Sequence, residues 1–235
     1  TKYLEDILEE YGYEIITNIG GNGFAAILKN GGNKTVLCRA DMDALPIKEE
    51  TGISFESVKT TKQNGMDVPI MHACGHDIHM TSLIGTAEYF SKNKDSWKGT
   101  IVFILQPAEE IGFGARQMIN AGLFKKIPYP DINLALHVSA QTQSGTVHIT
   151  PGFAMANVDS VDVTFYGEGG HGAYPHLTKD PIVMSSQFIT TVQTIISRNL
   201  SPINAGVVTV GSIHGGTKHN IIPNHVDLQI TVRSY

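Results

Sequence analysis

Residues 101–110, Ile101-Val102-Phe103-Ile104-Leu105-Gln106-Pro107-Ala108-Glu109-Glu110, decide the fold of this chain. The first five form an uninterrupted apolar run, as expected for an inner strand buried on both faces of a sheet. Further strands are predicted over residues 24–28, 34–39 and 132–136, and helices over residues 2–11, 77–91 and 115–121. Strands that alternate with helices predict an α/β sheet covered by helices on both sides.

The pattern changes after Thr150-Pro151-Gly152. Residues 160–166, 207–213 and 226–232 alternate apolar and polar side chains, as half-exposed strands do, and Asp180-Pro181 is typical of a helix start. We therefore predict two domains. Residues 1–152 form an α/β domain with a mixed, mostly parallel sheet, and residues 153–235 form a small α+β (ferredoxin-like) domain. A four-stranded version of the second domain needs another helix and strand, so we expect it to be truncated.

Polar side chains follow three of the predicted strands where each strand ends. Asp41 and Asp43 come after the strand ending at Arg39, Glu109 and Glu110 after residues 101–105, and His137 directly after Leu136. In open α/β sheets, ligands bind at the carboxyl ends of the strands. The loop Met71-His72-Ala73-Cys74-Gly75-His76-Asp77-Ile78-His79-Met80 adds a thiolate and imidazoles, which zinc-like ions prefer. The sequence therefore predicts a convergent metal site.

Composition excludes several other classes of protein. The 235 residues are 41% hydrophobic and 17% charged, with a net charge of -5, and no Lys/Arg cluster indicates a nucleic acid or an anionic membrane as partner. No apolar run approaches the roughly 20 residues that span a bilayer. The two cysteines do not make a disulfide framework, and Cys38 is expected to be a small core residue. A reducing cytoplasm is the expected compartment.

Six motifs together resemble the metal-dependent amidohydrolases that include N-acyl-L-amino acid amidohydrolases, hippurate hydrolases and plant indole-acetyl-amino acid hydrolases. They occur in that family's order and cover nearly the whole chain. The motifs are Arg39-Ala40-Asp41-Met42-Asp43-Ala44-Leu45-Pro46, residues 71–79, Gln106-Pro107-Ala108-Glu109-Glu110, Leu136-His137-Val138, Gly169-Gly170-His171-Gly172-Ala173-Tyr174-Pro175-His176 and Asn220-Ile221-Ile222-Pro223.

The resemblance implies a catalytic α/β domain with two divalent metal ions, Mn²⁺ or Zn²⁺, and an inserted lid domain that mediates homodimerisation. It implies that the ligands are Cys74, His76, Glu110 and His137. Glu109 matches the general base, and Asp43 matches the acid that supports the ligand shell. In the lid, His171 matches a histidine that steadies the oxyanion across a dimer, and Asn220 and Arg233 match residues that hold the substrate's carboxylate. The family's fifth ligand, a histidine beyond the lid, has no counterpart here, so we expect a fragment of a longer enzyme.

The chemistry agrees with hydrolysis of an N-acyl amino acid. Two cations about 3.5–4 Å apart activate a shared water and polarise the carbonyl, and of two adjacent glutamates one binds metal while the other takes the proton. Alternatives are a dinuclear aminopeptidase or dipeptidase, an inactive metal-binding protein, and a structural zinc module, which needs four closed N/S ligands. Single residues also have plain readings: Asp41 and Asp43 as turn caps, Asp77 as a helix cap, and His72 and His79 as supports for ligands.

Overall fold

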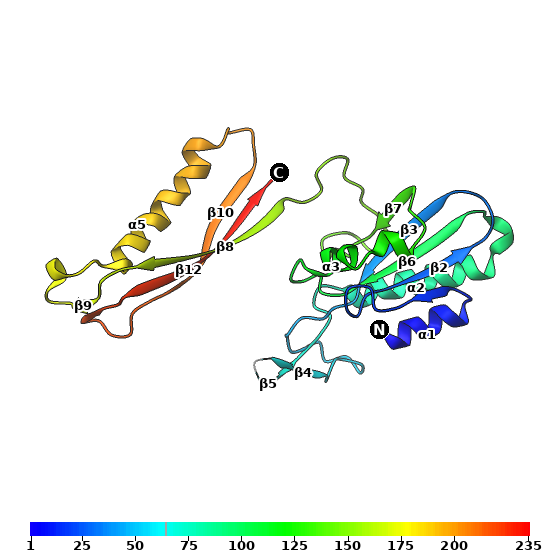
Figure 1. Ribbon diagram of the computed structural model, residues 1–235, viewed down its shortest axis with the longest axis horizontal. Coiled ribbons are helices and arrows are strands. Elements are labelled where there is room, and N and C mark those ends of the chain that lie inside the picture. The colour runs from blue at the N-terminus through cyan, green and yellow to red at the C-terminus, as the bar shows by residue number, and fades with distance from the viewer. Residues whose placement is uncertain (64) are drawn as a thin grey trace. The chain divides into compact units, whose positions relative to one another are not determined.

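The computed structural model describes residues 1–63 and 65–235, and the chain divides into two compact units (Figure 1). Unit 1 is Thr1–Gln143 and unit 2 is Ser144–Tyr235. Each unit has its own sheet and its own apolar core.

Unit 1 is built on a five-stranded mixed sheet with the order β1-β2-β6-β3-β7. In its centre, β3 (Thr35–Asp41) runs parallel to β6 (Thr100–Gln106) on one side and to β7 (Ile132–Ala135) on the other. Next to β6, β2 (Phe24–Lys29) is antiparallel, and so is β1 (Glu14–Ile16) to β2. Every residue of β6 after Thr100 is buried. The prediction of an inner strand at this place is confirmed.

Helices cover both faces of this sheet, as its alternating side chains require. Phe24 and Leu28 of β2 join the core cluster of α1 (Lys2–Glu10) and α2 (His76–Lys92), whereas Ala25 and Ile27 point to the opposite cluster. That second cluster includes Met118 of α3 (Gly114–Asn120) and Leu123 of α4 (Leu123–Lys126). A short helical turn, η1 (Lys94–Ser96), follows α2, and a hairpin of β4 (Thr60–Gln63) and β5 (Met66–Pro69) extends from the sheet (Figure 1).

The start of α2 differs from the expectation that Asp77 caps it. The helix begins at His76, its N-cap is Gly75, and Asp77 lies within the first turn. Gly75 has φ +77°, a left-handed conformation that glycine adopts without steric strain. An acidic side chain inside the first turn still interacts favourably with the helix dipole. Cys74 and His76 are thereby held on either side of the cap.

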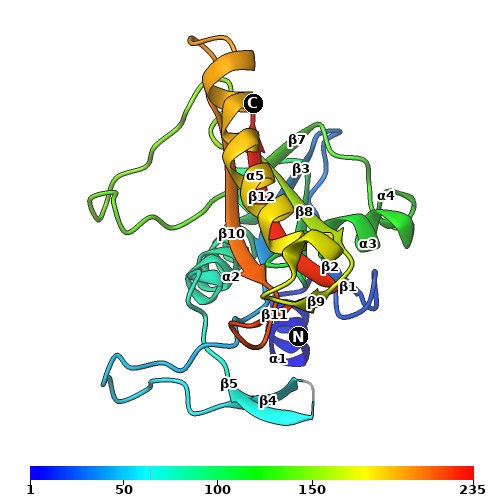
Figure 2. The ribbon, with the colours of Figure 1, turned by 90° about the vertical axis from the view of Figure 1, so that its left-hand side faces the viewer.

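Unit 2 has a three-stranded antiparallel sheet with the order β10-β12-β8 and one helix packed on it (Figure 2). β12 (His225–Ser234) lies between β8 (Asn157–Tyr166) and β10 (Gly206–His214). α5 (Pro181–Thr194) packs Phe188 and Ile189 against the apolar face of the sheet. Asp180 caps α5 by accepting from the backbone N–H groups of Ile182 and Val183 at 2.9 and 3.3 Å.

Short elements complete unit 2. β9 (Gly170–His171) pairs with β11 (Ile221–Ile222), and the turns η2 (Pro175–Leu177) and η3 (Ile195–Asn199) precede and follow α5. Among all the helices of the described residues, none is long and apolar enough to cross a bilayer.

Candidate metal centre

The carboxyl edge of the sheet in unit 1 gathers the polar groups that the sequence placed at strand ends. β3, β6 and β7 are parallel and adjacent, so their following loops meet at one edge. The first turn of α2 lies at the same edge. Three groups of side chains there have ligand atoms within 4.8 Å of one another, and His76 belongs to all three: Cys74, His76 and His137; Asp41, His76 and His79; His76, Glu109 and Glu110.

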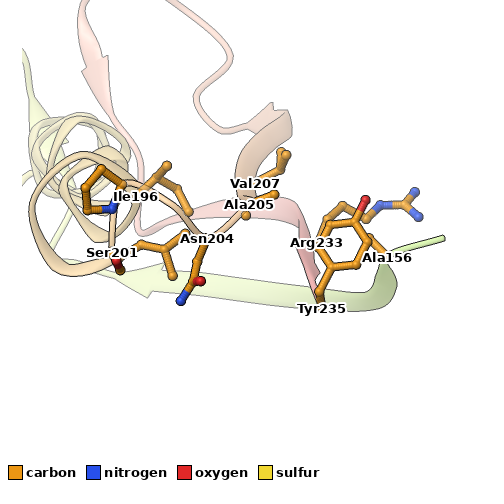
Figure 3. A pocket seen from close by; sticks show the side chains of 11 residues that line it. Ala156, Ile196, Ser201, Asn204, Ala205, Val207, Arg233 and Tyr235 are labelled. Atoms are coloured by element: carbon orange, nitrogen blue, oxygen red, sulfur yellow. The ribbon is translucent and has the colours of Figure 1, made fainter. Parts of the chain in front are cut away.

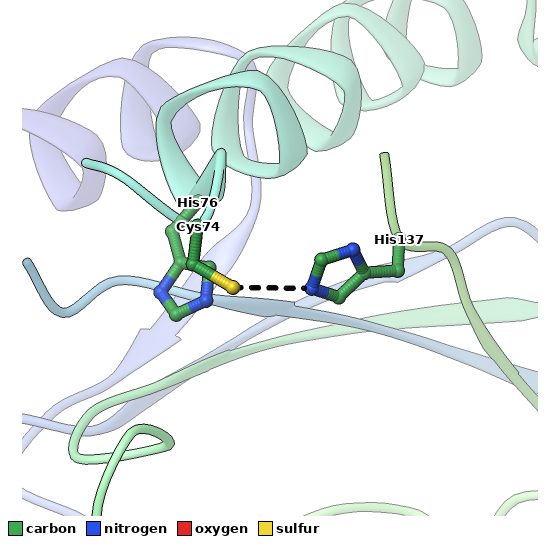
Figure 4. Close-up of side chains that lie close together, drawn as sticks. All are labelled: Cys74, His76 and His137. Carbon is green, nitrogen blue, oxygen red and sulfur yellow. Dashed lines mark hydrogen bonds between the residues drawn. The ribbon is translucent and has the colours of Figure 1, made fainter. Parts of the chain in front are cut away.

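Cys74 and His137 face one another (Figure 4). Cys74 Sγ lies 3.4 Å from His137 Nε2, and His137 Nδ1 lies 2.7 Å from the carbonyl oxygen of Val138. A carbonyl only accepts hydrogen bonds, so Nδ1 carries the ring proton and Nε2 presents a lone pair. The sulfur and this lone pair therefore lie close enough together to bind one cation.

His76 presents a second lone pair in a buried place. Its side chain is 1% exposed, and its Nδ1 donates to the carbonyl oxygen of Asp43 at 2.9 Å, which leaves Nε2 without a proton. Nε2 has no hydrogen-bond partner. It lies 3.6, 3.8 and 3.7 Å from carboxylate oxygens of Asp41, Glu109 and Glu110, respectively.

Such an arrangement needs a cation. A buried polar atom without a partner is unfavourable, and Glu110 Oε1 is also buried without a hydrogen-bond partner. A lone pair of His76 surrounded by carboxylate oxygens is electrostatically repulsive until a positive ion lies among them. The donor set of thiolate, imidazole and carboxylate suits divalent ions such as Zn²⁺. The residues at this edge therefore fit a metal ion.

The Cys74 thiol responds to the same negative charge. Burial, and then the carboxylates of Glu110, Glu109 and Asp41, raise the pKa of Cys74 above its ordinary value. The group is a neutral thiol at pH 7 while it is surrounded by anions alone. A bound divalent cation reverses that balance, because coordination deprotonates a thiol outright.

Asp43 organises the surroundings of these ligands. Its carbonyl oxygen accepts from His76 Nδ1 and from His72 Nδ1, the latter at 3.1 Å. Its carboxylate Oδ2 accepts from the backbone N–H of Glu110 at 3.0 Å. Asp43 alone thus orients both the helix that carries His76 and the loop that carries the glutamate pair.

Asp41 and His79 also lie at the centre, where the sequence suggested a turn cap for Asp41 and a support for the ligands for His79. Asp41 is completely buried and its Oδ1 lies 2.6 Å from His79 Nδ1. Burial tends to raise the pKa of Asp41, but the hydrogen bond from His79 and the Arg39 guanidinium outweigh it, so the pKa lies below its ordinary value. Two sequence signals were available: Asp41 shares a strand face with Arg39, and His79 shares a helix face with His76.

The remaining site residues that the sequence analysis named lie in unit 2. The exposed His171 is paired with Ile221 across β9 and β11, and Gly172 N–H donates to the carbonyl oxygen of Asn220 at 2.8 Å, so His171 and Asn220 are neighbours. Asn220 Oδ1 is buried and has no hydrogen-bond partner. The structure separates Arg233 from this pair, because it lies near the far end of β12, about 25 Å away at the rise of a strand.

Arg233 borders a cavity of about 560 Å³ in unit 2. Ile196 and Ser201 line the opposite side of that cavity, and Figure 3 shows the Arg233 guanidinium pointing away from them. Within the part of the chain that the structure describes, Arg233 forms no ion pair. It is therefore free to meet an anionic group from outside the cavity.

Comparisons with known proteins agree with this geometry. The profile of peptidase family M20/M25/M40 matches residues 37–230. The chain is 42% identical over 202 residues to an N-acetyldiaminopimelate deacetylase of Oenococcus oeni, covering 86% of this chain and 50% of that protein. It is 41% identical over 236 residues to an N-acetyl-L-cysteine deacetylase of Bacillus subtilis, covering 100% of this chain and 54% of that protein.

Solved structures show the same likeness. A dinuclear metal-binding peptidase of the M20 family from Bacillus subtilis superposes with a TM-score of 0.75 at 32% sequence identity, covering 100% of this chain and 58% of that one. The chain spans about half the length of the curated relatives it matches.

Proposed function

The chain belongs to peptidase family M20/M25/M40, and from this premise we propose that it is the metal-binding part of an amidohydrolase that releases the acyl group of small N-acyl amino acids. The observation that carries the proposal is the buried His76 Nε2, which has no hydrogen-bond partner and faces the carboxylates of Glu109 and Glu110. The deacetylases of Oenococcus oeni and Bacillus subtilis support the choice of substrate class.

Cys74, His76, Glu110 and His137 are the proposed ligands of two divalent ions, Mn²⁺ or Zn²⁺. When bound, two such ions act as Lewis acids on the amide carbonyl and acidify the attacking water. The thiol of Cys74 favours zinc-like ions, whereas the carboxylates also suit manganese. Asp43 orients His76 and Glu110 through its carbonyl and its carboxylate.

Glu109 is the proposed general base. Its side chain is 40% exposed against 21% for Glu110, so Glu109 is the member of the pair that reaches water and substrate. Its carboxylate takes a proton from the attacking water as the new C–O bond forms at the carbonyl carbon. It then returns that proton to the amide nitrogen, so that the C–N bond breaks and the amine leaves. Glu110 keeps its buried Oε1 toward His76.

Unit 2 is the proposed lid and dimerisation domain, and unit 1 the catalytic domain. His171 Nδ1 accepts from the backbone N–H of Ala173 at 3.1 Å, which leaves Nε2–H as a donor for the developing oxyanion. Asn220 and Arg233 are proposed to bind the substrate's carboxylate. Because Arg233 lies far from His171 along β12, the two groups suit the active sites of different subunits in a homodimer.

The compartment is proposed to be the cytoplasm. Cys38 and Cys74 are both free thiols, which fits a reducing environment.

The test is an activity panel on the metal-loaded protein. After Zn²⁺ or Mn²⁺ is added, N-acetyl and N-benzoyl amino acids should be hydrolysed to the carboxylic acid and the free amino acid. The corresponding N-acyl amino acid amides, in which the free carboxylate is replaced by a carboxamide, should react poorly. Hydrolysis of amino-acid anilides in preference to N-acyl amino acids would overturn the proposal.

Peptide hydrolysis is the second candidate. The B. subtilis structure is described as that of a dinuclear metal-binding peptidase. A dipeptide has both a free carboxylate and an amide bond but also carries an amino group where an N-acyl amino acid has none. Including Gly-Leu beside N-acetyl-leucine in the panel decides between the two substrate classes.

A further inference from the structure

A chain of hydrogen bonds crosses the carboxyl edge of the sheet in unit 1, through side chains outside the proposed ligand set. Val138 N–H donates to His79 Nε2 at 3.0 Å, and His79 Nδ1 lies 2.6 Å from Asp41 Oδ1. Arg39 Nη1 donates to Asp41 Oδ2 at 2.7 Å, and Arg39 Nε donates to Gln106 Oε1 at 3.0 Å. We call this chain of contacts the edge tie. It joins β3 to the last residue of β6 and to the loop that follows β7.

The edge tie fixes the protonation of the His79 ring. Nε2 accepts from a backbone N–H and therefore carries no proton, so Nδ1 carries it and donates to Asp41. Both ring nitrogens are occupied, whereas His76 Nε2 has no partner. His79 is thus unsuited to ligation, even though it lies close enough to His76 and Asp41 to be grouped with them.

The position of His79 connects the two halves of the candidate centre. Its ring centroid is 5.5 Å from that of His76, one turn earlier on α2, and 4.6 Å from that of His137. The backbone N–H that it accepts belongs to Val138, the residue directly after His137. His79 also contacts Asp41, and the other carboxylate oxygen of Asp41 lies 3.6 Å from His76 Nε2.

We propose that His79 is a positioning residue that sets the spacing between the Cys74–His137 pair and the His76–Glu110 pair. The inference rests on the proposed function only in taking these four residues as ligands. Without His79, Asp41 Oδ1 loses its partner in a buried place and the partly buried Val138 N–H loses its acceptor, so the loop that carries His137 is released from α2. Partners that orient metal ligands typically change metal affinity by about 10–100-fold when they are removed.

The first test measures Zn²⁺ affinity of the full chain by competition with a chromophoric chelator. His79→Phe fills the same space without polar atoms and should weaken binding about 10–100-fold. His79→Gln keeps one donor and one acceptor and should recover most of the loss. Leu83→Ala is the matched control, since Leu83 is a buried core residue one turn further along α2. It should lower thermal stability and leave Zn²⁺ affinity unchanged.

Two outcomes of this test overturn the role of His79. One is a His79→Phe protein that binds Zn²⁺ as the native chain does. The other is a Leu83→Ala protein that loses as much affinity as His79→Phe, because affinity would then follow stability and not the edge tie.

The second test uses the metal-free protein, so it does not depend on catalysis. Long-range ¹H–¹⁵N spectra should show His79 as the Nδ1–H tautomer, and the Val138 amide should exchange slowly in the native chain and in His79→Gln but fast in His79→Phe. An Nε2–H tautomer, or equal exchange of Val138 in all three proteins, contradicts the inference. Zn²⁺ binding without hydrolysis of any N-acyl amino acid defeats the proposed function and leaves this inference standing.

Discussion

The side chain of Val138 packs against Gly75 at the position where any other residue would carry its Cβ. Val138 Cγ2 is 2.3 Å from the point that a Cβ on Gly75 would occupy, and Gly75 has φ +77°. Because Val138 directly follows His137, this close approach brings the loop after β7 to the first turn of α2, where Cys74 and His76 lie. The candidate centre therefore depends on Gly75, which has no side chain and supplies no ligand atom.

Gly75→Ala should weaken both the fold and metal binding. A left-handed alanine costs about 1–2 kcal/mol, and the new methyl group must displace Val138. We expect a lower free energy of unfolding in denaturant titration and a lower metal content after dialysis. Gly85→Ala is the control, because Gly85 lies within α2 with open space around it. There alanine should stabilise the helix by about 0.5–1 kcal/mol.

Glu109→Gln should separate chemistry from metal binding. The amide keeps the shape of the side chain but does not take a proton, and loss of a general base typically lowers turnover by about 10²–10⁴-fold. Metal content, measured by atomic absorption, should stay at the native level. Glu110→Gln should instead lose metal. The reverse pattern would exchange the roles of the two glutamates.

Several of these features were predictable from the sequence because they depend on neighbours along the chain. The apolar run that ends at Leu105 identifies β6 as a buried strand, and the pair Glu109-Glu110 follows it after three further residues. The α5 start is equally local, since Asp180 and Pro181 both act within one helical turn. In such cases the pattern alone predicts the element and the end of it that carries polar groups.

Other features depend on contacts between distant segments. Asp41 and His79 are 38 residues apart, and only the packing of α2 on β3 brings them together. Asp77 has the right residue type for a helix cap, yet α2 begins at His76 with Gly75 as its N-cap, and Val138 leaves no room for a side chain at that cap. The periodicity of apolar residues does not reveal the surroundings of the α2 start, because they depend on the position of the loop after β7, which is distant in the sequence.

Cys74→Ser should remove a proton from the metal-binding reaction. The pKa of Cys74 is raised by burial and by the nearby carboxylates, so the free protein holds the thiol proton at pH 7 and a bound cation must displace it. Native affinity for Zn²⁺ should therefore rise with pH. Serine does not ionise, so the variant should bind more weakly and release about one proton fewer. Titration calorimetry in buffers of different ionisation enthalpy counts those protons, and an equal count in both proteins would exclude Cys74 as a ligand.

Mixing two inactive variants should restore activity if His171 acts on the partner's centre. His171 is exposed on β9 between Gly170 and Gly172, and its Nδ1 is already occupied by the Ala173 N–H, so only Nε2–H is free to reach a substrate. In a homodimer of Glu109→Gln and His171→Ala subunits, one of the two sites keeps both groups. Random exchange in a two-fold dimer makes half of the dimers mixed, which gives about a quarter of native activity. Each variant mixed with itself is the control and should stay inactive. A monomer by light scattering, or no recovery after subunit exchange has been confirmed by mass-tagged chains, would show that His171 does not act in trans.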